Sequence, residues 1–174
     1  MNMHCKVIGL TLALVLACGE AAAQNYPNKP VKWIVGFAAG GGNDVLARAI
    51  APKISEQLGQ QFIIENKTGA EGRIAADFVA KAAPDGYTIM SGASGQMVYN
   101  VGLFAPAGTP RAIIDKLYSE LSVVLKSDAL KERFAGMGQE TRGMGMPPAE
   151  FDAFFRAELA KWTKAIKDLN IRGE

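Results

Sequence analysis

The chain has 174 residues, of which 49% are hydrophobic, and a formal net charge of +2. This length suits one domain of ordinary size with a buried core. Because acidic and basic residues are mixed along the chain without a basic block, no nucleic acid partner is indicated.

Residues 1–23 have the organisation of a secretion signal. A weakly basic start precedes an apolar run at 7–17, which is too short to span a bilayer. The small residues that follow predict cleavage before Gln24, which would leave 24–174 as an exported mature protein. The alternatives are an uncleaved anchor helix and a lipid anchor at Cys18, whose preceding residues fit the lipid-attachment pattern poorly.

Cleavage there would remove the residue types that most metal sites and many enzymes need. His4, Cys5 and Cys18 are the histidine and the two cysteines of the sequence. The mature chain would then hold no disulfide, thiol nucleophile, Ser–His pair or His/Cys zinc site. We therefore expect no cofactor, no metal and no enzymatic activity, although a site made only of carboxylates remains open.

The first half of the mature chain alternates strands and helices. Short β-rich runs predict strands at 31–37, 61–66 and 87–92, and helical patterns cover 44–58 and 74–83. This order is typical of an α/β fold with a doubly wound, mainly parallel sheet and flanking helices.

Local signals refine the first predicted helix. Asn43 is the expected N-cap and Gly59 the expected residue just beyond the end. Pro52 in the middle predicts a kink.

The second half predicts an extended segment at 97–110 and then three helices. These cover 110–127, with Thr109 as N-cap, then 128–138 and finally 147–170. The last helix carries these core candidates: Phe151, Phe154, Phe155, Leu159, Trp162, Ile166 and Leu169.

Three predicted strands end in loops of small residues, at 37–44, 67–73 and 91–95. In an open parallel sheet, ligands bind beyond the carboxyl ends of the strands. The first two loops lead into helices, whose free N–H groups and positive dipole end bind anions without a basic side chain. Because the glycines fit neither G-x-G-x-x-G nor a Walker loop, we expect a carboxylate or phosphate rather than a nucleotide. Alternatively, the glycines only permit a tight turn.

Four conspicuous side chains have two interpretations each. Asp44 is either a first-turn acid favoured by the helix dipole or an acceptor for a ligand or a bound water. Arg73 is either solvated or paired with an acid in the cleft. Trp33 and Trp162 are interpreted as core residues rather than ligand platforms.

Four motifs occur here in an order that resembles the periplasmic solute-binding receptors of tripartite tricarboxylate transporters, the Bug-type receptors. They are F-A-x-G-G-x-x-D from Phe37, ENKTGAEG at 65–72, AAPDGYT at 82–88 and FAPAGTP at 104–110. The similar segments together are 26–92, 102–121 and 138–171.

The resemblance implies a receptor without catalytic activity, in which two lobes close by a hinge around a carboxylate. It implies membrane permease subunits as partners. It also implies that backbone groups and bound waters at two strand-end loops hold the ligand. The candidate ligand-binding residues are Phe37, Ala38, Ala39, Gly40, Gly41, Gly42, Asn43, Asp44, Ser91, Gly92, Ala93, Ser94 and Gly95.

The chain departs from the family in length. Family members are nearly twice as long, and only 93–101 occupies the interval that holds their second lobe, which places a deletion junction near Gly95–Val98. We expect a single lobe made of a β-α-β-α-β part (24–95) and a returning strand with C-terminal helices packed back on it (96–174). A cleft with one wall leaves its ligand half solvated, so carboxylate binding should be weak or absent.

Three other functions compete with a receptor lobe. The chain can be a deleted remnant without function, or a module that docks on the permease without ligand. A small enzyme with an oxyanion-type loop is the third, but Glu150 and Asp152 are interpreted as a solvated helix face rather than as acid/base machinery.

Overall fold

A computed structural model describes residues 25–92, 102–136 and 145–168 of the chain. The predicted signal segment and the predicted deletion junction lie outside these ranges. None of the helices in the described ranges combines the length and the apolarity needed to cross a membrane.

The described part is built on one four-stranded sheet in the order β2-β1-β3-β4. Its strands are β1 (Val31–Val35), β2 (Phe62–Asn66), β3 (Thr88–Gly92) and β4 (Gly102–Phe104). β1 pairs in parallel with both β2 and β3, and β4 is antiparallel to β3. The mainly parallel α/β sheet is thus confirmed. The connection from β1 leads to β2 on one side of β1, and the connection from β2 leads to β3 on the other side of β1. The topological switch point therefore lies between β1 and β3.

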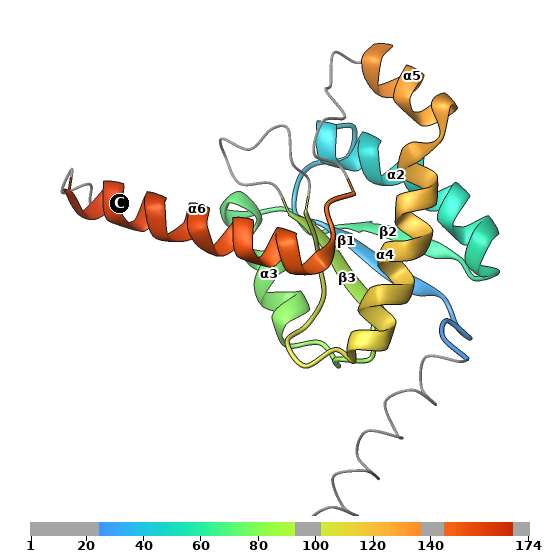
Figure 1. The fold of residues 1–174 in the computed structure, drawn as a ribbon, viewed down its shortest axis with the longest axis horizontal. Coiled ribbons are helices and arrows are strands. Elements are labelled where there is room, and N and C mark those ends of the chain that lie inside the picture. The colour runs from blue at the N-terminus through green and yellow to red at the C-terminus, as the bar shows by residue number, and fades with distance from the viewer. Residues whose placement is uncertain (1–24, 93–101, 137–144, 169–174) are drawn as a thin grey trace, which may run out of the picture.

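Two helices cover opposite faces of this sheet (Figure 1). Side chains alternate along a strand, so Trp33 and Val35 pack toward α2 (Gly42–Leu58), whereas Ile34 packs toward α3 (Arg73–Ala80). A short 3₁₀ turn, η1 (Ala70–Gly72), precedes α3. The prediction that Trp33 is a core residue is confirmed, since only 2% of it is exposed.

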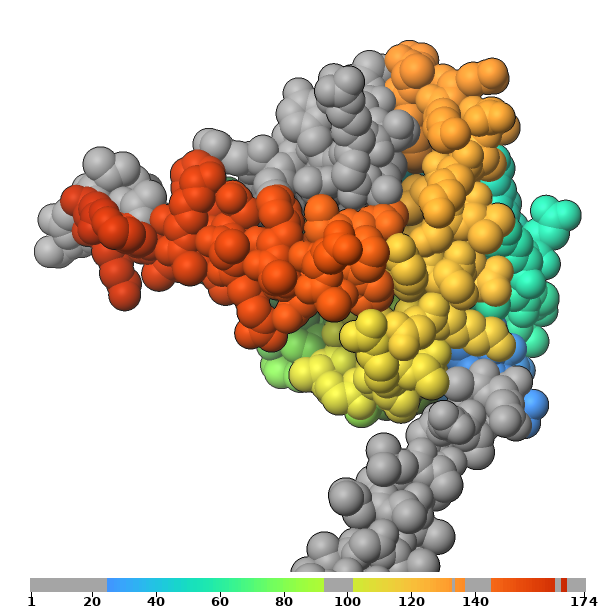
Figure 2. All heavy atoms as spheres, viewed as in Figure 1, coloured from blue at the N-terminus to red at the C-terminus, as the bar shows by residue number. Residues whose placement is uncertain are grey.

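The C-terminal part adds α4 (Arg111–Lys126), α5 (Asp128–Gly136) and α6 (Pro148–Asp168). α4 packs against α2 and completes the core on that face. Only the first turns of α6 reach the sheet edge, where Phe104 contacts Phe151 and Phe155 edge to face. Figures 1 and 2 show the rest of α6 running away from the body of the molecule.

The projecting part of α6 corrects the predicted core. Leu159 and Trp162 are 58% and 41% exposed, so the prediction that they are core residues is wrong. Elsewhere in the C-terminal part, α4, α5 and the first turns of α6 do pack on the lobe, since Leu130 and Phe134 of α5 are buried in the same core as α4. Phe154 is half-buried. The side chains of Ile166 and Leu169 lie outside the described residues.

Several predicted helix ends are also corrected. Gly41, not Asn43, is the N-cap of α2, since Gly41 has the extended conformation and Asn43 is already helical. Thr109 is not the N-cap of α4, because its hydroxyl donates instead to the carbonyl of Pro106 and Pro110 takes that place. Gly59 ends α2 in the left-handed conformation, as predicted.

The remaining boundaries differ less from the expectation. α2 continues as one helix through Pro52. α3 ends at Ala80, three residues before the predicted end at 83.

Two glycines of the fold give a matched test of packing. Gly59 and Gly86 both have positive φ, but a Cβ at Gly59 meets nothing within 4 Å, whereas one at Gly86 lies 2.5 Å from Cγ2 of Ile113. We expect Gly59→Ala to lower the free energy of unfolding by about 1 kcal/mol, the penalty of the left-handed backbone. Gly86→Ala should lower the free energy of unfolding by a further amount of about 1–3 kcal/mol, because its added methyl group overpacks the site. Urea unfolding of both variants measures this, and equal losses would contradict the packing around Gly86.

Candidate functional site

The carboxyl ends of β1, β2 and β3 meet at one edge of the sheet and carry the predicted loops. The chain leaves β1 at Val35, turns through Phe37 to Gly41 and enters α2. Asn66 ends β2 and Gly92 ends β3 at the same edge. The ends of the three predicted strands therefore lie at one edge of the sheet, as the sequence analysis expected.

The carboxylate of Asp44 connects the loop after β1, α2 and β2 by hydrogen bonds. It is buried, and its Oδ2 accepts the backbone N–H of Gly40 at 2.8 Å. The Nε of Arg48 donates to both carboxylate oxygens, at 3.0 and 2.9 Å, and Nδ2 of Asn66 donates to Oδ1 at 2.9 Å. Each oxygen thus accepts two hydrogen bonds, which uses the acceptor capacity of the group. Neither sequence interpretation foresaw this, because the carboxylate holds the protein's own loop.

The same contacts fix the charge of Asp44. The hydrogen bond from Arg48, followed by that from the Gly40 amide, lowers the pKa of Asp44 to about 2, although burial acts in the opposite direction. Asp44 is therefore ionised at neutral pH and paired with a guanidinium. An anion arriving at this edge meets a neutral ion pair rather than a bare carboxylate.

Asn66 and Arg48 are site residues that the sequence analysis missed. Asn66 also donates through Nδ2 to the carbonyl of Phe37 at 3.0 Å, and its Oδ1 accepts from Nη2 of Arg48 at 3.0 Å. Two signals could have identified them. Arg48 stands four residues after Asp44, the spacing of a helical ion pair, and Asn66 is a polar residue at the end of a strand.

Some backbone N–H groups between Gly40 and Asn43 donate a hydrogen bond within the protein, and others have no acceptor among the described residues. The N–H of Gly40 donates to Asp44, and that of Gly41 donates to the carbonyl of Ala38 at 3.1 Å. The N–H groups of Gly42 and Asn43, in the first turn of α2, have no acceptor among the described residues. Such groups carry the positive end of the helix dipole. The available anion donors are therefore at the helix start rather than in the glycine turn.

Ser91 adds an unusual hydroxyl near the carboxyl end of β3. It lies on β3 opposite Val35, and it is fully buried. Its Oγ has no hydrogen-bond partner in the described part of the chain. Because Ser91 is two residues beyond Ile89, its side chain faces the same side of the sheet as α2. A buried hydroxyl without a partner is rare and calls for an explanation.

The other predicted loop positions contribute less to this edge. Phe37 is half-buried and lies over Gly72 of the second loop, while Ala38 and Ala39 are exposed. Gly92 is half-buried, and a Cβ there would meet the ring of Phe104 at 2.8 Å. Ala93, Ser94 and Gly95 lie outside the described residues. Ligand contact at all the predicted positions stays a prediction.

The second loop serves packing. A Cβ on Gly36 would lie 3.0 Å from Cα of Gly72, so the backbone just after β1 lies against the backbone of the second loop. Arg73 is exposed, and it forms no ion pair with a described residue. This agrees with its interpretation as a solvated side chain.

The acidic pair predicted on the last helix lies on its solvent side. Glu150 and Asp152 are exposed on α6, and Asp152 pairs with Arg156 at 2.8 Å, as expected for a solvated helix face. The described residues contain no group of three His, Cys, Asp or Glu side chains that could hold a metal ion.

Comparison with known proteins supports the resemblance given by the motifs. A family model described as "Tripartite tricarboxylate transporter family receptor" matches residues 46–100. Protein BugT of Bordetella pertussis is 36% identical over 119 residues, which is 67% of this chain and 36% of that protein. The UPF0065 protein in the tcbD-tcbE intergenic region of a Pseudomonas species is 40% identical over 90 residues, which is 50% of this chain and 27% of that protein. The matched part thus spans about a quarter to a third of these relatives' length.

A solved structure shows the fold independently. The structure of the periplasmic binding protein BugD superposes with a TM-score of 0.74 at 18% identity, covering 86% of this chain and 100% of that chain. At this identity the likeness shows the fold alone. It confirms an α/β lobe of the periplasmic binding protein type.

The bonds of Asp44 make the stability of the chain depend on pH. A carboxyl whose pKa falls from 3.8 unfolded to about 2 folded contributes stability above pH 3.8, which is lost as the pH falls toward 2. We expect Asp44→Asn to lose about 2 kcal/mol of unfolding free energy at pH 7. The difference from the unsubstituted protein should shrink below pH 4, as measured by urea unfolding at several pH values.

Asp77→Asn is the matched control. Asp77 also pairs with a base four residues along its helix, but both partners are mostly exposed. Asp77→Asn should lower the free energy of unfolding by about 0.5 kcal/mol or less, because the ion pair is solvated. Equal effects of the two substitutions, or a constant difference across the acid range, would show that the Asp44 contacts do not stabilise the loop.

Proposed function

We propose that this chain, whose resemblance to the receptors of tripartite tricarboxylate transporters is confirmed, is a one-lobed solute-binding component of such a transporter. It binds a small carboxylate weakly at the strand-end edge, in the periplasm, and acts with membrane permease subunits. It is not an enzyme. One observation carries this proposal: the first-turn amides of α2 and the buried hydroxyl of Ser91 are donors without acceptors in the described structure.

The chemistry of this edge favours a small anion, and the resemblance to carboxylate receptors makes a carboxylate the proposed guest. The N–H groups of Gly42 and Asn43 offer hydrogen bonds of about 1.5–3 kcal/mol each to a charged acceptor. The helix dipole adds about 0.3–1 kcal/mol for an anion. The neutral pair of Asp44 and Arg48 adds no repulsion, and the Ser91 hydroxyl supplies another donor on the same face as α2.

A single lobe limits the affinity. Tight small-molecule sites bury most of the ligand surface, and here the described residues offer one wall beyond the strand ends. The second wall would have to come from the interval at 93–101, which is too short for a lobe. Weak binding therefore follows from an internal deletion.

Two other functions remain as alternatives. A module that docks on the permease without ligand is favoured if carboxylates do not bind, and capture of the chain by purified permease subunits would identify it. A deleted remnant would give no stable processed product in the periplasmic fraction. Sequencing the gene across codons 93–101 would show whether the deletion is real.

Titration with succinate, a dicarboxylate, and citrate, a tricarboxylate, tests the proposed site. We expect the amide resonances of Gly42 and Asn43 to shift saturably at millimolar ligand, because these N–H groups gain an acceptor. Succinamide, which has the same shape without charge, should produce no such shift. Micromolar affinity by calorimetry would contradict a site with one wall. Unchanged Gly42 and Asn43 resonances would contradict carboxylate binding at α2.

Ser91→Ala tests the role of the hydroxyl in that site. Loss of one donor to a charged acceptor should weaken succinate binding by about tenfold. Ser122→Ala is the matched control, because the Ser122 hydroxyl is likewise buried without a partner among the described residues but lies on α4. If both variants bind succinate equally well, Ser91 has no part in the site.

A further inference from the structure

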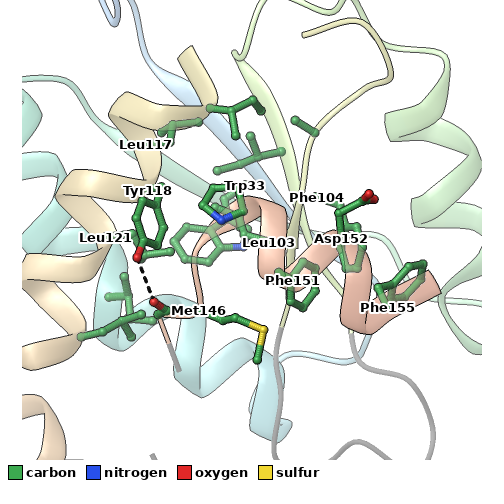
Figure 3. Close-up of a pocket in the computed structure, with 18 of the residues that line it drawn as sticks. Trp33, Leu103, Phe104, Leu117, Tyr118, Leu121, Met146, Phe151, Asp152 and Phe155 are labelled. Atoms are coloured by element: carbon green, nitrogen blue, oxygen red, sulfur yellow. Dashed lines mark hydrogen bonds between the residues drawn. The ribbon is translucent and has the colours of Figure 1, made fainter. Parts of the chain in front are cut away.

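A second candidate site lies away from the strand ends, in a cavity of about 470 Å³. Its walls come from β1, β3, β4, α2, α4 and the N-terminal part of α6, and Figure 3 shows many of the lining side chains. No residue of the loop 37–44 lines it, and neither does Ser91 or Gly92. Its volume is in the range of small-molecule pockets, about 300–1,000 Å³.

The cavity contains a buried donor without an acceptor. Trp33 is 2% exposed, and its Nε1 has no hydrogen-bond partner among the described residues. Figure 3 places Trp33 between Tyr118 and Leu121 of α4 on one side and Phe151 of α6 on the other. Buried indole N–H groups usually have a partner, because an unpaired donor loses its hydration without compensation. Nε1 has almost no accessible surface, so a guest that brings an acceptor would satisfy this group after a small shift of the side chains around it.

The charges of the lining argue against an anionic guest. Among the described residues that line the cavity, the charged side chains are Asp152 and Arg156. They pair with each other at 2.8 Å, and their side chains are 60% and 76% exposed, so they stand at the rim. A carboxylate inside would meet no free cation, and burying an unpaired charge is strongly unfavourable. The guest is therefore neutral.

Most of the remaining lining is aliphatic, and the rings of β4 and α6 gather at one end, which favours an aromatic ring at that end of the cavity. The ring of Phe104 lies edge to face against Phe151 and Phe155, with centroids 5.7 and 5.4 Å apart. Aromatic pairs of this kind gain more than burial alone supplies. Tyr118 closes the opposite side, held by a hydrogen bond of 3.1 Å from its hydroxyl to the carbonyl of Gly145 (Figure 3).

We propose that this cavity is a binding site for a neutral aromatic molecule that carries one hydrogen-bond acceptor. Its ring packs among the aromatic side chains of β4 and the first turns of α6. Its acceptor oxygen accepts a hydrogen bond from Nε1 of Trp33. The site is independent of the carboxylate site, so either can fail without the other.

Acetophenone, an aromatic ketone, is a suitable probe, and the indole N–H resonance of Trp33 is the readout. The chain has two tryptophans, and Trp162→Phe identifies the Trp33 resonance because Trp162 lies outside the lining. We expect a saturable downfield shift with acetophenone. Ethylbenzene, which lacks the acceptor, should bind about tenfold more weakly and without that shift. Benzoate should also bind more weakly than acetophenone.

A pair of substitutions on α4 separates cavity binding from adsorption to the surface. Leu121→Phe places extra volume in the cavity and should weaken acetophenone binding by at least tenfold, as excluded volume does. Val123→Phe, at a 58% exposed position of the same helix, should leave binding unchanged. No saturable shift of the Trp33 resonance, equal affinity for ethylbenzene, or equal loss in both variants would overturn the proposal.

Discussion

The candidate site depends on one buried carboxylate, that of Asp44. A charge removed from water is unfavourable unless hydrogen bonds and an opposite charge replace the hydration. Here Gly40, Arg48 and Asn66 supply these contacts, and they come from the loop after β1, from α2 and from β2. The carboxylate can keep its partners only when all three segments are in place. It therefore fixes where α2 begins and which of its amides are left without an acceptor.

The fold separates two regions of opposite chemistry. At the strand ends, α2 presents unpaired N–H groups and its positive dipole end, which suit an anion. In the cavity between α4 and α6, a mainly apolar lining with aromatic rings at one end contains the N–H of Trp33, which has no acceptor among the described residues and suits a neutral guest. Both regions are incomplete in the same way: they hold donors whose acceptors the described chain does not supply. α6 continues past the cavity with exposed apolar side chains such as Leu159.

Local patterns in the sequence predicted the strands, the helices and the α/β sheet, since periodicity and turn residues report on short segments. Gly59 ended α2 as expected because a left-handed residue is a local requirement. The contacts of Asp44 were not predictable in this way, since Asn66 lies 22 residues along the chain and meets Asp44 only through the sheet. The burial of Trp162 was predicted wrongly, because an amphipathic pattern indicates an apolar face but not what covers it.

Amide hydrogen exchange at the start of α2 tests the central role of Asp44 most directly. If the carboxylate holds the loop, the Gly40 amide exchanges much more slowly than those of Gly42 and Asn43, after correction for intrinsic rates. Asp44→Asn then removes the protection of Gly40 and leaves the other two fast. A Gly40 amide that exchanges as fast as Gly42 in the unsubstituted protein, or that keeps its protection in Asp44→Asn, would contradict the account.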